Sequence, residues 1–180
     1  MEKSIRSKII EKIIIFSAIG IVFWLLTPNG GYSLYLILVL SGLFALFYHF
    51  NKSKTIPIKA LILGIFLVVF DFIVENAGAL LGYWNTYGSR FFVGAVPIEI
   101  MTLIFFGGIA WAMHLPKKFN KFFLLAESTV FGFYGASGEY LLILNGLMTY
   151  KDGWNSVDAF FGYFFTWVIL FFVWYKIINK

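Results

Sequence analysis

Six long apolar runs, separated by short polar breaks, make up most of this chain and constrain its fold more than any other feature. An α-helix needs about 20 predominantly apolar residues to cross the hydrocarbon core of a bilayer. The chain is 61% apolar and 13% charged, whereas soluble domains average about 45–50% and about 25%. We therefore expect one all-α integral membrane domain over residues 1–180. Its six expected transmembrane helices cover residues 9–26, 32–50, 58–77, 91–113, 122–144 and 157–178.

The basic residues predict how these helices are oriented. Of the 14 Lys and Arg residues, all but Arg90 and Lys151 fall on the side that six spans assign to both termini. Lys and Arg are enriched in cytoplasmic loops, so both termini are expected in the cytoplasm and the protein in the cell membrane as a multi-pass chain. The short breaks leave no room for a soluble nucleotide-binding, hydrolase or nucleic-acid-binding domain.

The acidic residues show a different distribution. Five of them are expected near the outer ends of their helices: Asp71, Glu75, Glu99, Glu139 and Asp158. Asp71 and Glu75 are four residues apart and share a helix face. A carboxyl group within hydrocarbon is costly unless it is paired, protonated or hydrated, which makes it a candidate functional group. Glu127 lies toward the opposite leaflet, and we expect it to pair with Lys117 or Lys121.

A sparse internal repeat supports a site between two halves. Shifting the chain by 68 residues places Asp71 on Glu139, and it also superposes three glycines, since Gly64, Gly78 and Gly94 fall on Gly132, Gly146 and Gly162. The shift predicts two parallel three-helix repeats related by a pseudo-axis along the membrane normal. A substrate site at the repeat interface is expected from this arrangement.

Three motifs carry a family resemblance. Asp71-Phe-Ile-Val-Glu75-Asn76-Ala-Gly78, Gly82-Tyr83-Trp84-Asn85 and Gly94-Ala-Val96-Pro97-Ile98-Glu99 together resemble the lycopene cyclase domain family. The second half, from Glu139 through Trp154 to Tyr163, is similar to the related membrane carotenoid hydratases. The resemblance covers residues 58–175 and implies a bundle of three-helix repeats. The chain departs from the cyclase pattern at Ile100, where a second Glu is expected, and this puts cyclisation in particular in doubt.

The resemblance implies a cofactor-independent change to a carotenoid or isoprenoid end group, in which a carboxylic acid protonates an olefin. The enzyme would be a cyclase, catalysing an isomerisation, or a hydratase. Glu99 is the expected acid, and Asp71 and Glu75 are its expected partners or the terminal base. Glu139 is a further expected catalytic residue. The expected substrate contacts are Asn76, Tyr83, Trp84 and Trp154. Because isomerisation and hydration need no redox cofactor, the resemblance implies none. With no Cys and two His, no metal site is expected either.

Two other functions remain open. The same acids could relay protons or bind a cationic solute in a small transporter or a substrate-binding membrane subunit. The chain could also be a non-catalytic membrane assembly partner. The expected partners are the bilayer, an apolar isoprenoid and possible homo- or hetero-oligomers, with no nucleic acid.

Overall fold

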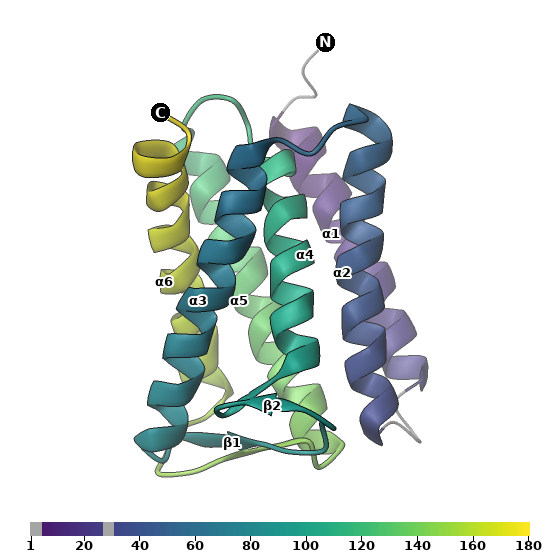
Figure 1. The fold of residues 1–180 in the computed structure, drawn as a ribbon, viewed down its shortest axis with the longest axis vertical. Helices are drawn as coiled ribbons and strands as arrows, with labels where there is room; N and C mark the ends of the chain where they lie inside the picture. The colour runs from purple at the N-terminus through teal and green to yellow at the C-terminus, as the bar shows by residue number, and fades with distance from the viewer. Residues whose placement is uncertain (1–4, 27–30) are drawn as a thin grey trace.

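The computed structural model describes residues 5–26 and 31–180, and these form six helices and four short strands (Figure 1). The helices are α1 Ile5–Leu26, α2 Gly31–Ser53, α3 Ile58–Leu80, α4 Ile98–His114, α5 Lys121–Leu144 and α6 Ser156–Val173, which continues as η2 Trp174–Ile178. The strands are β1 Trp84–Thr86, β2 Phe92–Val93, β3 Val96–Pro97 and β4 Met148–Tyr150. The predicted all-α fold is confirmed. Figure 1 shows the strands at one end of the bundle, here called the strand end, and the C-terminus at the other, the terminal end.

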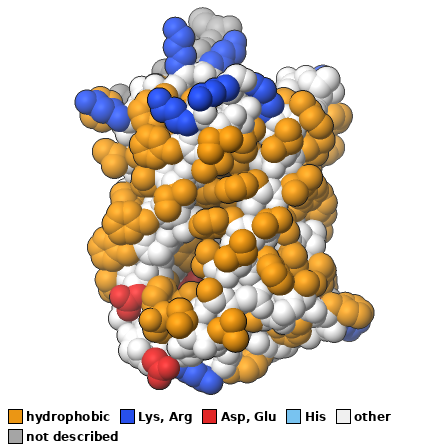
Figure 2. Space-filling view, turned by 60° about the vertical axis from the view of Figure 1, so that its left-hand side comes forward, with side chains coloured by type: hydrophobic (Ala, Val, Ile, Leu, Met, Phe, Trp, Pro, Cys, Tyr) orange, Lys and Arg blue, Asp and Glu red, His pale blue; other side chains and the backbone are white. Residues whose placement is uncertain are grey.

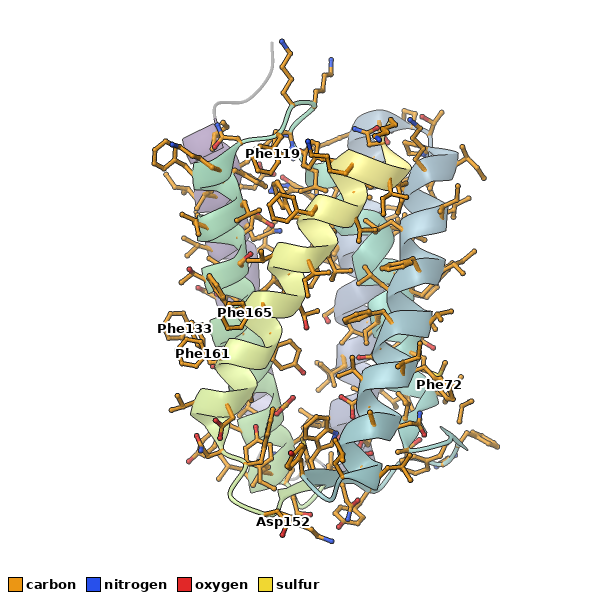
Figure 3. All side chains as sticks on the ribbon, turned by 90° about the vertical axis from the view of Figure 1, so that its left-hand side faces the viewer. Phe72, Phe119, Phe133, Asp152, Phe161 and Phe165 are labelled. Carbon is orange, nitrogen blue, oxygen red and sulfur yellow. The ribbon has the colours of Figure 1, made fainter. Side chains whose placement is uncertain are left out.

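The surface between these ends is apolar. Figure 2 shows hydrophobic side chains over the middle of the molecule and most of the visible Lys and Arg side chains at the terminal end. In Figure 3, Phe133, Phe161 and Phe165 project outward from α5 and α6, and each is at least half exposed. Within the described residues, the segments Ser33–Ser53 and Ser156–Ile178 are long and apolar enough to cross a membrane. The crossing of all six helices, and their orientation, stay predictions.

Helix α4 begins seven residues later than the sequence indicates. Residues 91–97 instead form the antiparallel pair β2–β3, with Phe92 opposite Pro97 and Val93 opposite Val96. Gly94 takes a φ of +64° in the turn, and Pro97 holds an extended backbone at the N-cap of α4. Because Pro97 lacks a backbone N–H and disfavours a helical residue before it, the apolar run cannot start its helix earlier.

Two helix–strand–helix units meet through β1 and β4, which pair antiparallel with Asn85 opposite Thr149. The C-terminal turns of α3 and α5 repeat at an offset of 64 residues. Tyr83 N–H donates to Gly78 O at 2.9 Å, and Leu147 N–H donates to Leu142 O at 2.8 Å.

This structural repeat corrects both the predicted offset of 68 and the predicted three-helix unit. The repeated unit has two helices, and Glu75, rather than Asp71, corresponds to Glu139. No single offset fits the whole chain, because β2–β3 lengthens the first loop while α4 and α6 begin only 58 residues apart.

The helices pack as neighbouring pairs, α2 on α4, α3 on α4 and α5 on α6. One apolar core lies toward the terminal end and includes Leu63, Leu67, Ile109, Phe123 and Leu170. A second core at the strand end includes Leu34, Tyr35, Trp84, Leu142 and Met148.

Candidate functional site

Three carboxyl groups gather at the strand end, where β1 and β4 hold the last turns of α3 and α5 together. Asp71 and Glu75 project from successive turns of α3, and Glu139 comes from the equivalent part of α5. Their charges act on one another, and on Tyr163 of α6. We call Asp71, Glu75 and Glu139 the carboxyl cluster. The sequence predicted these three acids as site residues, and the fold brings them together from two elements.

Each acid of the carboxyl cluster has different polar neighbours. Glu75 accepts a hydrogen bond of 2.8 Å from the indole N–H of Trp84. Glu139 accepts one of 2.5 Å from the Tyr150 hydroxyl and another from the Tyr163 hydroxyl. Oδ2 of Asp71 is buried, and no hydrogen-bond partner for it exists among the described residues. The cluster therefore contains two engaged carboxyl groups and one with an oxygen still available.

Three aromatic rings cover this region on the side of the loops. Tyr83 stacks on Trp154 with ring centroids 5.3 Å apart, and Trp84 lies 4.9 Å from Trp154. Trp84 is buried against α3 because Gly78 has no side chain, since a Cβ there would lie 1.9 Å from the indole. We call Tyr83, Trp84 and Trp154 the aromatic layer. The faces of such rings attract positive charge.

Glu99 and Asn76 have other contacts. Glu99 is 5% exposed and accepts a hydrogen bond of 2.6 Å from the Ser89 hydroxyl. Asn76 accepts from the Ala95 N–H at 3.0 Å and donates to Phe72 O at 2.7 Å, so it fixes the β2–β3 turn to α3. Both residues thus support the loop that precedes α4. Their expected contact with substrate stays a prediction.

Asp158 has a local structural role, since its side chain forms a capping box with Asn155 at the start of α6. The capping box accounts for a carboxylate at this position.

Tyr150 and Tyr163 are the site residues that sequence reasoning missed. Tyr163 reaches Glu139 from α6 because α5 packs on α6, whereas Tyr150 lies on β4, only 11 residues beyond Glu139 in the chain. One signal was present in the sequence: Gly135 lies one turn before Glu139. A Cβ at position 135 would come within 2.3 Å of the Tyr163 ring, so Gly135 makes room for that ring.

A second buried polar group lies toward the terminal end. Lys12 and Glu127 form an ion pair of 2.5 Å with side chains only 8% and 2% exposed. The Trp111 indole donates to the same carboxyl oxygen at 3.0 Å. Glu127 therefore pairs with Lys12 of α1 and not with the expected Lys117 or Lys121. The sequence could not predict this pair, because its two residues are 115 positions apart.

Neither polar group resembles a metal centre, because the described residues contain no set of three or more His, Cys, Asp or Glu that could hold an ion.

No protein-family model, no curated protein and no solved structure matches the chain. The resemblance to the lycopene cyclase domain family therefore stays a prediction.

Proposed function

We propose that this chain is a six-span membrane protein with its strand end outside the cell and both termini in the cytoplasm. Two features support this. The visible helical surface is apolar between the ends, and most of the visible Lys and Arg side chains lie at the terminal end (Figure 2). The loops of the strand end carry Tyr83, Trp84 and Trp154, which are residue types enriched where membrane meets water.

We propose further that the carboxyl cluster modifies an apolar isoprenoid by protonating one of its double bonds. The observation that carries this proposal is the buried, unpartnered Oδ2 of Asp71 in a group of three acids. A carboxylic acid kept neutral by its surroundings can protonate a poorly basic group. The aromatic layer supplies ring faces that stabilise a tertiary carbocation. A second carboxylate of the cluster ends the reaction by taking a proton.

The transporter alternative uses the same acids but needs a path to the other leaflet. The apolar core formed by Leu63, Leu67, Ile109 and Leu170 lies on the terminal side of the cluster. Polar residues along such a path mark ion and proton routes in membrane proteins. The apolar core favours a one-sided site for a lipid substrate over a channel.

The proposal is tested by expressing the protein in a host that accumulates lycopene and analysing the pigments. We expect loss of lycopene with the wild-type chain and retention of lycopene with Asp71→Asn, because Asn cannot donate an acidic proton. Asp152→Asn, the same substitution at an exposed loop position, is the matched control and should remain active. Unchanged lycopene in cells with well-expressed wild-type protein would count against a carotenoid substrate.

A further inference from the structure

We propose that Tyr163 is a positioning residue that, together with Tyr150, holds Glu139 as the carboxylate of the cluster and leaves the transferable proton on Asp71. The catalytic meaning of this assignment rests on the proposed function, but the location of the proton can be measured without any substrate. The assignment differs from the sequence-based expectation, in which Glu99 is the acid.

Burial opposes a charge on Glu139, but its hydroxyl donors favour the charged form, and Oδ2 of Asp71 has no such donor among the described residues. Glu139 accepts hydrogen bonds from the hydroxyls of Tyr150 and Tyr163, and a carboxylate is an acceptor only. Hydrogen bonds to an ionised acceptor are about twice as strong as neutral ones. Burial and the neighbouring Glu139 raise the pKa of Tyr150 well above its usual value, so this phenol keeps the proton that it donates.

The surroundings of Asp71 favour its neutral form. Glu75 and Glu139 both act on it as like charges, and its buried Oδ2 receives no donor from the described residues. A buried charge without a partner is expensive, and the group avoids this cost by binding a proton. Glu75 lies between these two cases, since it accepts one hydrogen bond from Trp84.

The position of Tyr163 is built into the helix packing. Its ring lies against Gly135 on α5, where even a methyl group would come within 2.3 Å of two ring carbons. The hydroxyl therefore reaches Glu139 one turn further along the same helix. The charges of Glu75 and Asp71 also act on Tyr163, so its hydroxyl lies within electrostatic range of all three acids.

The resulting reaction is balanced in atoms and charge. The O–H bond of Asp71 breaks, and its proton forms a C–H bond with the π electrons of the olefin, leaving a tertiary carbocation. The Glu139 carboxylate then removes a proton from a carbon beside the cation of the cyclised product, or from a water molecule that adds to the cation. Return of that proton to Asp71 restores the cluster.

Infrared spectroscopy of the full-length protein in lipid nanodiscs tests the assignment, because protonated and ionised carboxyl groups absorb separately. We expect a protonated-carboxyl band at neutral pH that Asp71→Asn removes and Glu139→Gln leaves in place. Tyr163→Phe should shift this band, because the loss of one donor lets Glu139 compete for the proton. Tyr140→Phe, an exposed position beside Glu139, is the matched control and should leave the spectrum unchanged.

Two results would overturn the assignment. One is the absence of any protonated-carboxyl band, and the other is a band that survives Asp71→Asn. If Asp71→Asn does not fold, Asp71→Glu serves in its place, since it should move the band while Glu139→Asp should not. A proton located on Asp71 in a protein that leaves lycopene unchanged would refute the proposed function alone.

Discussion

At the residue scale, the role of each acid depends on its neighbours more than on its place in a motif. Glu75 and Glu139 occupy equivalent positions in the two units, yet one accepts from an indole and the other from two phenols. Glu99, in the most family-like motif, binds a serine hydroxyl that belongs to its own loop. Hydrogen-bond donors therefore distinguish carboxyl groups that the sequence presents as alike.

Gly78→Ala tests the packing that supports the aromatic layer. The added methyl group would meet the Trp84 indole at 1.9 Å, so the ring must move and lose its bond to Glu75. We expect a loss of about 1–3 kcal/mol in the free energy of unfolding, as for other overpacked sites. The measurement is an unfolding curve in detergent, monitored through tryptophan fluorescence.

Gly138→Ala is the control for this change, because no atom lies within 4 Å of the added group. Alanine is the better helix former, so this variant should be neutral or more stable by up to about 1 kcal/mol. Equal destabilisation by both substitutions would contradict the packing explanation.

At the element scale, α1 is attached to the bundle by charge as well as by apolar contact. Lys12 reaches the buried Glu127 on α5, and Lys8 donates to the carbonyl of His114 at 2.9 Å, at the end of α4. A lysine at a helix C-terminus also interacts favourably with the helix dipole. In the sequence, Lys8 and Lys12 indicate only membrane orientation. In the structure they attach α1 to α4 and α5.

Lys12→Met should destabilise the protein by about 3–5 kcal/mol, because it leaves the carboxylate of Glu127 buried without its cation. The double variant Lys12→Met with Glu127→Gln should recover part of this loss, since no unpaired charge remains. Thermal unfolding of both variants measures the difference.

Lys52→Ala provides the comparison for an exposed pair. Its partner is Glu11 at 2.6 Å, and the lysine side chain is 46% exposed. Exposed ion pairs contribute about 0–1 kcal/mol, so only a small change is expected. A larger effect at Lys52 than at Lys12 would be inconsistent with a buried attachment of α1.

The positions of the helices could be predicted from the sequence, whereas the contacts between distant elements could not. Apolar runs indicate helices because their length and composition are local properties. The β2–β3 pair could not be predicted because residues 91–97 are apolar enough to continue the helical run. Only Gly94 and Pro97 argue against a helix there. The partners Lys12–Glu127 and Glu139–Tyr163 depend on helix packing, and no spacing along the chain encodes it.

At the scale of the whole molecule, charge and apolar surface divide along the long axis. Most of the visible Lys and Arg side chains lie at the terminal end, and apolar side chains cover the middle (Figure 2). The aromatic layer and the carboxyl cluster lie toward the strand end. The start of α1 and the end of α6 lie at the same end of the bundle (Figure 1). A chain that crosses a membrane an even number of times requires this arrangement.

Cysteine labelling on intact cells tests this arrangement, and the chain has no native Cys to interfere. A membrane-impermeant maleimide should label Thr149→Cys at the strand end directly and Lys118→Cys at the terminal end only after permeabilisation. Ile73→Cys, on the apolar surface of α3 and 60% exposed, should resist labelling in both conditions because the thiolate is disfavoured in hydrocarbon. Labelling of Lys118→Cys in intact cells would reverse the proposed orientation.

The strand pairing between the two units is self-complementary. Tyr87 N–H donates to Leu147 O and Lys151 N–H donates to Tyr83 O, both at 2.7 Å, so one contact occurs twice with the partners exchanged. Such self-complementarity is the property of a twofold homodimer interface. The two units therefore pair through β1 and β4 as two copies of one chain pair across a twofold axis. At the offset of 64, however, Asp71 in one unit corresponds to Gly135 in the other. One unit thus carries an acid where the other leaves the space for a tyrosine ring.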